Sequence, residues 1–168
     1  MLLEAGLAEF FKVTSHAAEQ MWEDWPRTAS EMGRFAKEGD TEAAAKGEAL
    51  ARLAEVAMEA LRKNTAQIRE LGTYPETLLG EKERLDAQVP AIESLQTAGR
   101  TKESGIVDRS ALERLKTRLD FVSEETKTEI PRYVGLLASY AINYERANEM
   151  LEKCAVWLAG NARAPKRA

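Results

Sequence analysis

The stretch TEIPRYVGLLASYAINYERANEMLEKCAVWL, residues 128–158, places a proline inside a long helical pattern. Its apolar and aromatic residues alternate four and three positions apart, an average of about 3.5 residues, which is the period of a coiled coil. They are Tyr133, Leu137, Tyr140, Tyr144, Ala147, Leu151, Cys154 and Leu158. This spacing predicts a helix that packs against other helices over the whole stretch.

The same stripe continues upstream of the proline through Leu112, Leu115, Leu119 and Val122, so we expect one helix over residues 108–158. Pro131 removes one backbone hydrogen bond and clashes with the carbonyl four residues earlier, which predicts a bend near Lys127.

The rest of the chain also shows helical spacing, with no period-two alternation that would predict a strand. The stretch EGD at 38–40, followed by Thr41, is a break or a kink. In LGTYP at 71–75, Gly72 suits a helix end and Pro75 suits a first turn. We therefore predict helices at about 2–38, 41–71, 75–98 and 108–158, with Pro90 bending the third, and a flexible basic tail at 159–168.

These elements predict an all-α fold: an antiparallel, coiled-coil-like bundle of three or four long, kinked helices forming one domain over residues 1–158. The helix count depends on the break at 38–40. The composition agrees, because 44% hydrophobic and 31% charged residues are typical of a soluble helical protein. The start of the chain carries Glu4 and Glu9 and lacks the basic region of a signal peptide, so we expect a cytoplasmic location.

No catalytic or metal-binding constellation is present in the sequence. His16 is the only histidine and Cys154 the only cysteine, and both lie on helical stripes where we expect them to pack in the core. The glycines form no phosphate-binding pattern, and the Glu-x-x-His signature of di-iron bundles is missing. We therefore expect no enzyme, metal or cofactor. The sequence pI of about 5.3 argues against nucleic acid as a partner.

One region is locally basic. Residues 97–118 hold six basic and three acidic residues, a net charge of +3, in a chain whose net charge is −4. The basic residues are Arg100, Lys102, Arg109, Arg114, Lys116 and Arg118. Such a run indicates either contact with an anionic surface or an ordinary solvated helix face.

Trp22 and Trp25 lie three residues apart and therefore share one face of a helix. The pair either fills the core or forms an interface, where tryptophan is enriched.

Several segments together resemble a BAR domain of the sorting-nexin type. Residues 112–158 are similar to the last helix of such domains, residues 25–39 and 48–71 to the first, and residues 74–98 to the start of the second. The positions that carry the likeness in the last helix are Phe121, Val122, Ser123, Glu124, Glu129, Tyr133, Tyr144 and Trp157.

The resemblance implies a non-enzymatic dimeric module for membrane association or curvature sensing in endosomal or vesicle trafficking, peripheral on membranes. Its partners would be a second copy or a related helical protein, and an anionic membrane surface approached by the six basic residues. The dimer interface would use Phe10, Phe11, Trp22, Trp25, Tyr140, Tyr144 and Trp157. These rings could instead fill the core of one chain.

Two alternatives remain open at this point. The acidic body of the chain favours a helical protein–protein interaction scaffold without lipid binding. A ligand-sensing four-helix bundle is the other.

Overall fold

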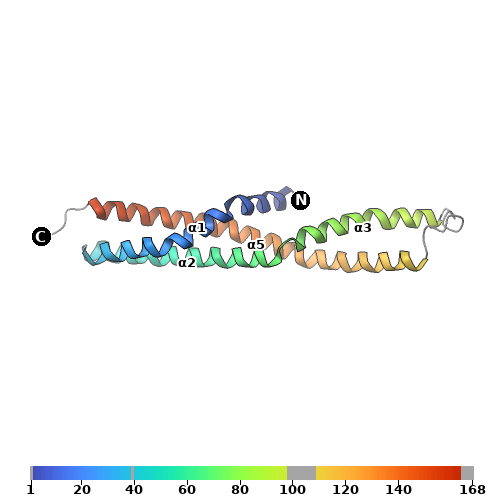
Figure 1. Ribbon diagram of the computed structural model, residues 1–168, viewed down its shortest axis with the longest axis horizontal. Helices are drawn as coiled ribbons and strands as arrows, with labels where there is room; N and C mark the ends of the chain where they lie inside the picture. The colour runs from blue at the N-terminus through green and yellow to red at the C-terminus, as the bar shows by residue number, and fades with distance from the viewer. Residues whose placement is uncertain (1, 39, 98–108, 164–168) are drawn as a thin grey trace. The chain divides into compact units, whose positions relative to one another are not determined.

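A computed structural model describes residues 2–38, 40–97 and 109–163, with side chains placed within 5–38, 40–97 and 109–161. The regular structure in these ranges is α-helix throughout, in four elements (Figure 1). They are α1 (Leu2–Glu38), α2 (Thr41–Leu71), α3 (Tyr74–Thr97) and α5 (Arg109–Arg163). The all-α bundle predicted from the sequence is confirmed.

The breaks between helices follow local chemistry. The break before α2 is real, and the Ala44 amide donates to the Asp40 carbonyl at 2.8 Å, which closes the first turn. Gly72 adopts a φ of 55°, the left-handed conformation that ends a helix at low steric cost for glycine. Pro75 is the second residue of α3, where its missing amide N–H loses no helical hydrogen bond.

The end of α5 differs from the prediction. The helix continues through Pro131 and runs to Arg163, so assigning residues 159–163 to a flexible tail is wrong. The Asn161 side chain donates to the Trp157 carbonyl at 2.8 Å and supports this last turn. Residues 164–168 lie outside the described residues. The bends expected at Pro90 and Lys127 stay predictions.

The chain divides into two compact units, Met1–Glu70 with Val134–Ala168 and Leu71–Tyr133, which we call unit 1 and unit 2. Unit 1 therefore contains α1, α2 and the C-terminal part of α5. Unit 2 contains α3 and the N-terminal part of α5.

Unit 1 is a three-helix bundle in which α2 runs antiparallel to α1 and to α5 (Figure 1). Its buried residues recur every seven positions on each helix, the repeat that keeps one apolar seam facing its neighbours. They include Ala18, Trp25 and Met32 on α1, Ala54, Leu61 and Ile68 on α2, and Tyr140, Ala147 and Cys154 on α5. The Asn143 side chain donates to Asn64 across the α2–α5 pair. Arg69 of α2 forms an ion pair with Glu19 of α1.

Unit 2 is an antiparallel pair of helices, α3 and the first part of α5. Leu78, Leu85 and Val122 form its core, and Leu115 and Leu119 pack against them. Two helices alone enclose little apolar surface. Ion pairs from Lys116 to Glu93 and from Arg118 to Glu81 also join α3 to α5.

Candidate functional site

Tyr140 lies at the centre of an aromatic cluster inside unit 1. Its ring contacts Phe11 edge-on at a centroid distance of 4.9 Å, Phe10 at 6.1 Å and Tyr144 at 6.0 Å. The side chain is 0% exposed, and its hydroxyl is hydrogen-bonded to Thr14 at 2.8 Å. Burial raises the pKa of Tyr140. The structure therefore assigns Tyr140 to the core of a single chain and corrects the dimer interface expected for it.

Trp157 is likewise committed to its own chain, since only 7% of its surface is exposed. Its indole N–H donates to the Ala43 carbonyl at 3.0 Å, and its ring lies on Gly47 of α2. Trp25 is also largely buried, with 8% of its surface exposed. Phe10, Phe11, Trp22 and Tyr144 are partly exposed. A second chain could reach these four rings, so a dimer stays a prediction.

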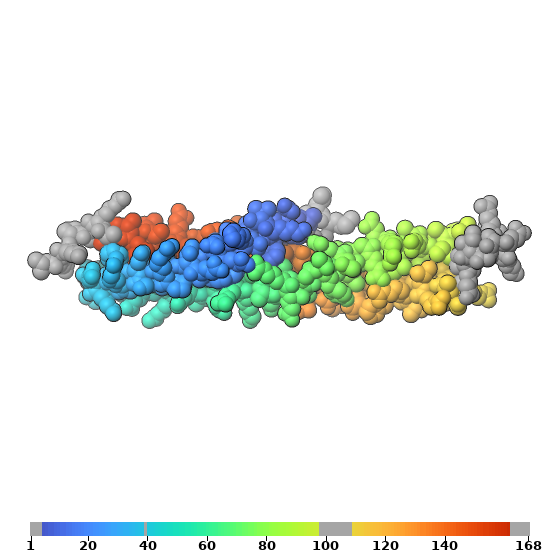
Figure 2. Space-filling view, in the orientation of Figure 1, coloured from blue at the N-terminus to red at the C-terminus, as the bar shows by residue number. Residues whose placement is uncertain are grey.

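The surface of unit 1 carries a groove along each of its helix pairs. Figure 2 shows the exterior of this unit, with α1 (blue) lying between α5 (red) and α2 (cyan to green). We name the grooves by their helices: the α2/α5 groove, the α1/α5 groove and the α1/α2 groove.

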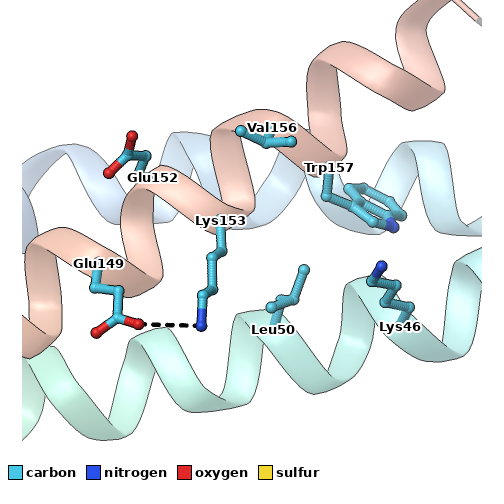
Figure 3. A pocket seen from close by; sticks show the side chains of 7 residues that line it. All are labelled: Lys46, Leu50, Glu149, Glu152, Lys153, Val156 and Trp157. Atoms are coloured by element: carbon cyan, nitrogen blue, oxygen red, sulfur yellow. Dashed lines mark ion pairs between the residues drawn. The ribbon is translucent and has the colours of Figure 1, made fainter.

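The α2/α5 groove has a volume of about 620 Å³ and is lined by Trp157 and Val156. Figure 3 shows the side chains of Lys153 and Trp157 pointing from α5 toward α2, where Leu50 and Lys46 face them. Lys153 forms an ion pair with Glu149 at 3.2 Å. The lining also includes Glu152, so two lysines and two glutamates line the groove, which carries no net charge.

The α1/α5 groove is larger, about 750 Å³, and mostly apolar. Val13, Met21, Tyr144, Leu151 and Leu158 contribute to its floor, and Asp24 is the one charged residue among the residues that line it. His16 also lines this groove and is exposed, so its expected core position is wrong.

The α1/α2 groove has a volume of about 490 Å³ and brings together the two tryptophans that the sequence places on one face. Trp22, Trp25 and Pro26 line it from α1. Glu55, Val56, Met58, Glu59 and Arg62 line it from α2. The Trp25 indole N–H donates to Glu55 Oε1 at 3.4 Å, which joins the two walls.

The basic region of unit 2 is partly neutralised by α3. Lys116 Nζ lies 2.7 Å from Glu93, and the Arg118 guanidinium donates to both oxygens of Glu81 at 2.6 and 2.9 Å. These hydrogen bonds raise the pKa of Lys116 and of Arg118. The Arg118 guanidinium also lies 5.1 Å from the centre of the Phe121 ring.

Of the other four predicted lipid-binding residues, the structure describes two. Arg109 and Arg114 are exposed and form no ion pair with any residue that the structure describes. Arg100 and Lys102 lie outside the described residues. Of the four described cations, Arg109 and Arg114 are therefore unpaired within the described residues, and Lys116 and Arg118 are paired with α3.

The remaining chemistry of the described ranges is sparse. Within residues 2–38, 40–97 and 109–163, no group of three or more His, Cys, Asp or Glu residues could hold a metal ion. Cys154 is buried as expected, and burial raises the pKa of its thiol, which keeps it protonated and a poor nucleophile. Over the same ranges, no helix is long and apolar enough to cross a bilayer.

No protein-family model, curated protein or solved structure matches this chain. The surface grooves were not found from the sequence, although one signal was present. Val13, Val56 and Val156 lie off the apolar stripes, and an aliphatic residue outside the core register is a candidate surface contact.

Proposed function

We propose that this protein is a helical protein-interaction scaffold whose binding surfaces are the grooves of unit 1. The observation that carries the proposal is that each of the three named grooves presents one strongly exposed valine. Val13 lines the α1/α5 groove and is 70% exposed, Val56 lines the α1/α2 groove and is 70% exposed, and Val156 lines the α2/α5 groove and is 68% exposed.

Single exposed apolar residues are common on soluble proteins and need no explanation by themselves. Here each valine lies beside at least one partly or largely buried ring, from Trp22, Trp25, Tyr144 or Trp157. Aromatic residues are enriched in protein interfaces, and a groove between two helices is a common seat for an amphipathic helix of a partner.

A membrane-associated, BAR-like dimer is the second candidate, and exposed Arg109 and Arg114 favour it. At about 1 kcal/mol for each cation near an anionic surface, these two would contribute about 2 kcal/mol to membrane binding. Lys116 and Arg118 would first have to leave Glu93 and Glu81. Lipid binding therefore has less support than protein binding.

Site-specific photo-crosslinking tests the scaffold proposal. A photoreactive amino acid replaces Val13, Val56 or Val156 in turn, and the protein is irradiated in the cells that produce it. Lys63, which is exposed on α2 and lines none of the three grooves, is the matched control position.

We expect a discrete adduct with another polypeptide from at least one valine position and none from Lys63. An adduct at twice the mass of the chain would identify the partner as a second copy. Equal labelling at all four positions, or adducts with lipid alone, would contradict the proposal.

Co-sedimentation with phosphatidylserine vesicles tests the membrane candidate separately. Salt-sensitive binding that is lost when Arg109→Glu and Arg114→Glu are combined would support it. Binding that is absent, or unchanged by the two substitutions, would exclude these arginines as a lipid-binding surface.

A further inference from the structure

We infer that the α1/α2 groove binds an arginine side chain of a partner protein, through the tryptophans of α1 and the carboxylates of α2. The inference rests on the proposed interaction function and identifies the chemistry of the partner at one groove.

The aromatic wall consists of Trp22, partly exposed, and Trp25, which is largely buried and held by its indole hydrogen bond to Glu55. Tryptophan has the most favourable ring face for a cation, and the attraction is strongest where the cation is partly desolvated. A groove of about 490 Å³ between two helices provides such a partly desolvated position.

The opposite wall carries an excess of negative charge. Glu55 and Glu59 lie one turn apart on α2 and both line the groove, whereas Arg62 is the one cation among the lining residues. Two carboxylates and one guanidinium leave a net charge of −1. Among the described residues, Arg62 forms no ion pair with either carboxylate. The two glutamates are therefore available to a cation from outside the chain.

The aromatic wall and the two carboxylates together favour arginine over lysine. A guanidinium is planar, stacks on aromatic faces and presents five N–H donors in a fixed fork, so one group can contact an indole and donate to several oxygens at once. An ammonium group is a compact charge that prefers to keep its water. Arginine and tryptophan are also the residues most enriched at the energetic centres of protein interfaces.

Nuclear magnetic resonance of the indole N–H groups tests the inference on the full chain. The protein has three tryptophans, so three indole signals are expected, and single Trp→Phe variants assign them. The probe is Nα-acetyl-arginine amide, and the control probe is Nα-acetyl-citrulline amide, which has nearly the same shape and no charge. Trp157 is the internal reference, since its indole is bonded to Ala43 and lines a different groove.

We expect the arginine probe to shift the Trp22 and Trp25 signals saturably and to leave the Trp157 signal in place, with no shift from the citrulline probe. Glu55→Gln and Glu59→Gln should each weaken binding about fivefold, the effect of about 1 kcal/mol for one exposed charge pair. Glutamine at position 55 keeps an acceptor for the Trp25 indole, so this variant isolates the charge. Glu70→Gln, on α2 outside the groove, is the matched control and should bind as the parent does.

Arg62→Gln provides a test in the opposite direction, because removal of the cation that lines the groove should tighten binding of the arginine probe. Equal shifts from the citrulline probe, a parallel shift of Trp157, or no effect of both glutamate substitutions would overturn the inference. If crosslinking from Val56 succeeds while the arginine probe fails, the scaffold function stands and the arginine partner is wrong. If the arginine probe binds while no groove position crosslinks to protein, the scaffold function is wrong.

Discussion

Replacing Gly47 with alanine tests how closely α2 and α5 approach each other in unit 1. Gly47 is buried beneath the Trp157 ring, and a Cβ atom added there would lie 2.3 Å from Cζ2, 2.6 Å from Cε2 and 2.8 Å from Cη2. Carbon atoms in contact prefer separations of about 3.5–4.0 Å. The ring would therefore have to move by about 1 Å or more, away from a position fixed by its hydrogen bond to Ala43.

The expected loss of stability follows from three contributions. Overpacking of a core costs about 1–3 kcal/mol, and loss of the Trp157–Ala43 hydrogen bond costs about 0.5–1.5 kcal/mol. Alanine returns about 1 kcal/mol through its higher helix propensity. The free energy of unfolding should fall by about 0.5–3.5 kcal/mol.

Gly33→Ala is the matched control, because Gly33 is a helical glycine of unit 1 where an added Cβ would meet nothing within 4 Å. Its free energy of unfolding should rise by about 1 kcal/mol, from the higher helix propensity of alanine alone. Urea unfolding followed by tryptophan fluorescence measures both variants, and it reports on unit 1 because Trp22, Trp25 and Trp157 all lie there.

In a Trp157→Phe background the smaller ring removes the clashing atoms, so Gly47→Ala should cost much less than in the parent. Stabilisation by Gly47→Ala equal to that by Gly33→Ala would refute the close packing of α2 on α5.

Three further outcomes are expected. Asn64→Leu or Asn143→Leu alone should lower the free energy of unfolding by about 1–3 kcal/mol, since the remaining amide loses its partner, whereas the double variant should recover most of it in urea unfolding. In Tyr140→Phe, loss of the bond to Thr14 should cost about 0.5–1.5 kcal/mol at neutral pH. Because the pKa of Tyr140 is raised in the folded state, its contribution to stability is complete below the ordinary value of 10.0 and declines above it. Tyr140→Phe should therefore lose less stability than the parent when thermal unfolding is followed at alkaline pH. An equal loss would contradict the burial of the Tyr140 hydroxyl. The hydrogen bond from Arg118 lowers the pKa of Glu81. The contribution of Glu81 to stability is therefore present above the ordinary value of 4.5 and is lost as the pH falls below it. Glu81→Gln should show a weaker acid dependence of the melting temperature, which circular dichroism measures.

The helical fold could be predicted from the sequence because its signals are local. Leu137, Tyr140, Ala147 and Cys154 were placed on one stripe by spacing alone, and all four are fully buried. Gly72 ends a helix through its own backbone conformation, which the sequence around it already indicated. Features of this kind depend on residues within a turn or two of each other.

The candidate sites could not be predicted to the same degree, because they depend on which residues face each other across helices. Trp157 lies beside the predicted stripe yet is more buried than its stripe neighbour Leu158, since Gly47 of α2 leaves room for the indole. The sequence predicts Lys116 and Arg118 as lipid-binding residues, whereas the pairing of α3 with α5 places Glu93 and Glu81 opposite them. The residue pattern of one helix does not determine which residues of another helix lie opposite it.

The buried cysteine of unit 1 can report local opening of the bundle through its reaction with a thiol reagent. Cys154 is the only thiol in the chain and is fully covered by its neighbours, so a thiol reagent can react with it only after α5 separates locally from the bundle. At saturating reagent, where every opening leads to reaction, the rate of that reaction measures how often unit 1 opens under native conditions. A partner bound across α5 would slow the reaction, and the same thiol would then report occupancy without any added label.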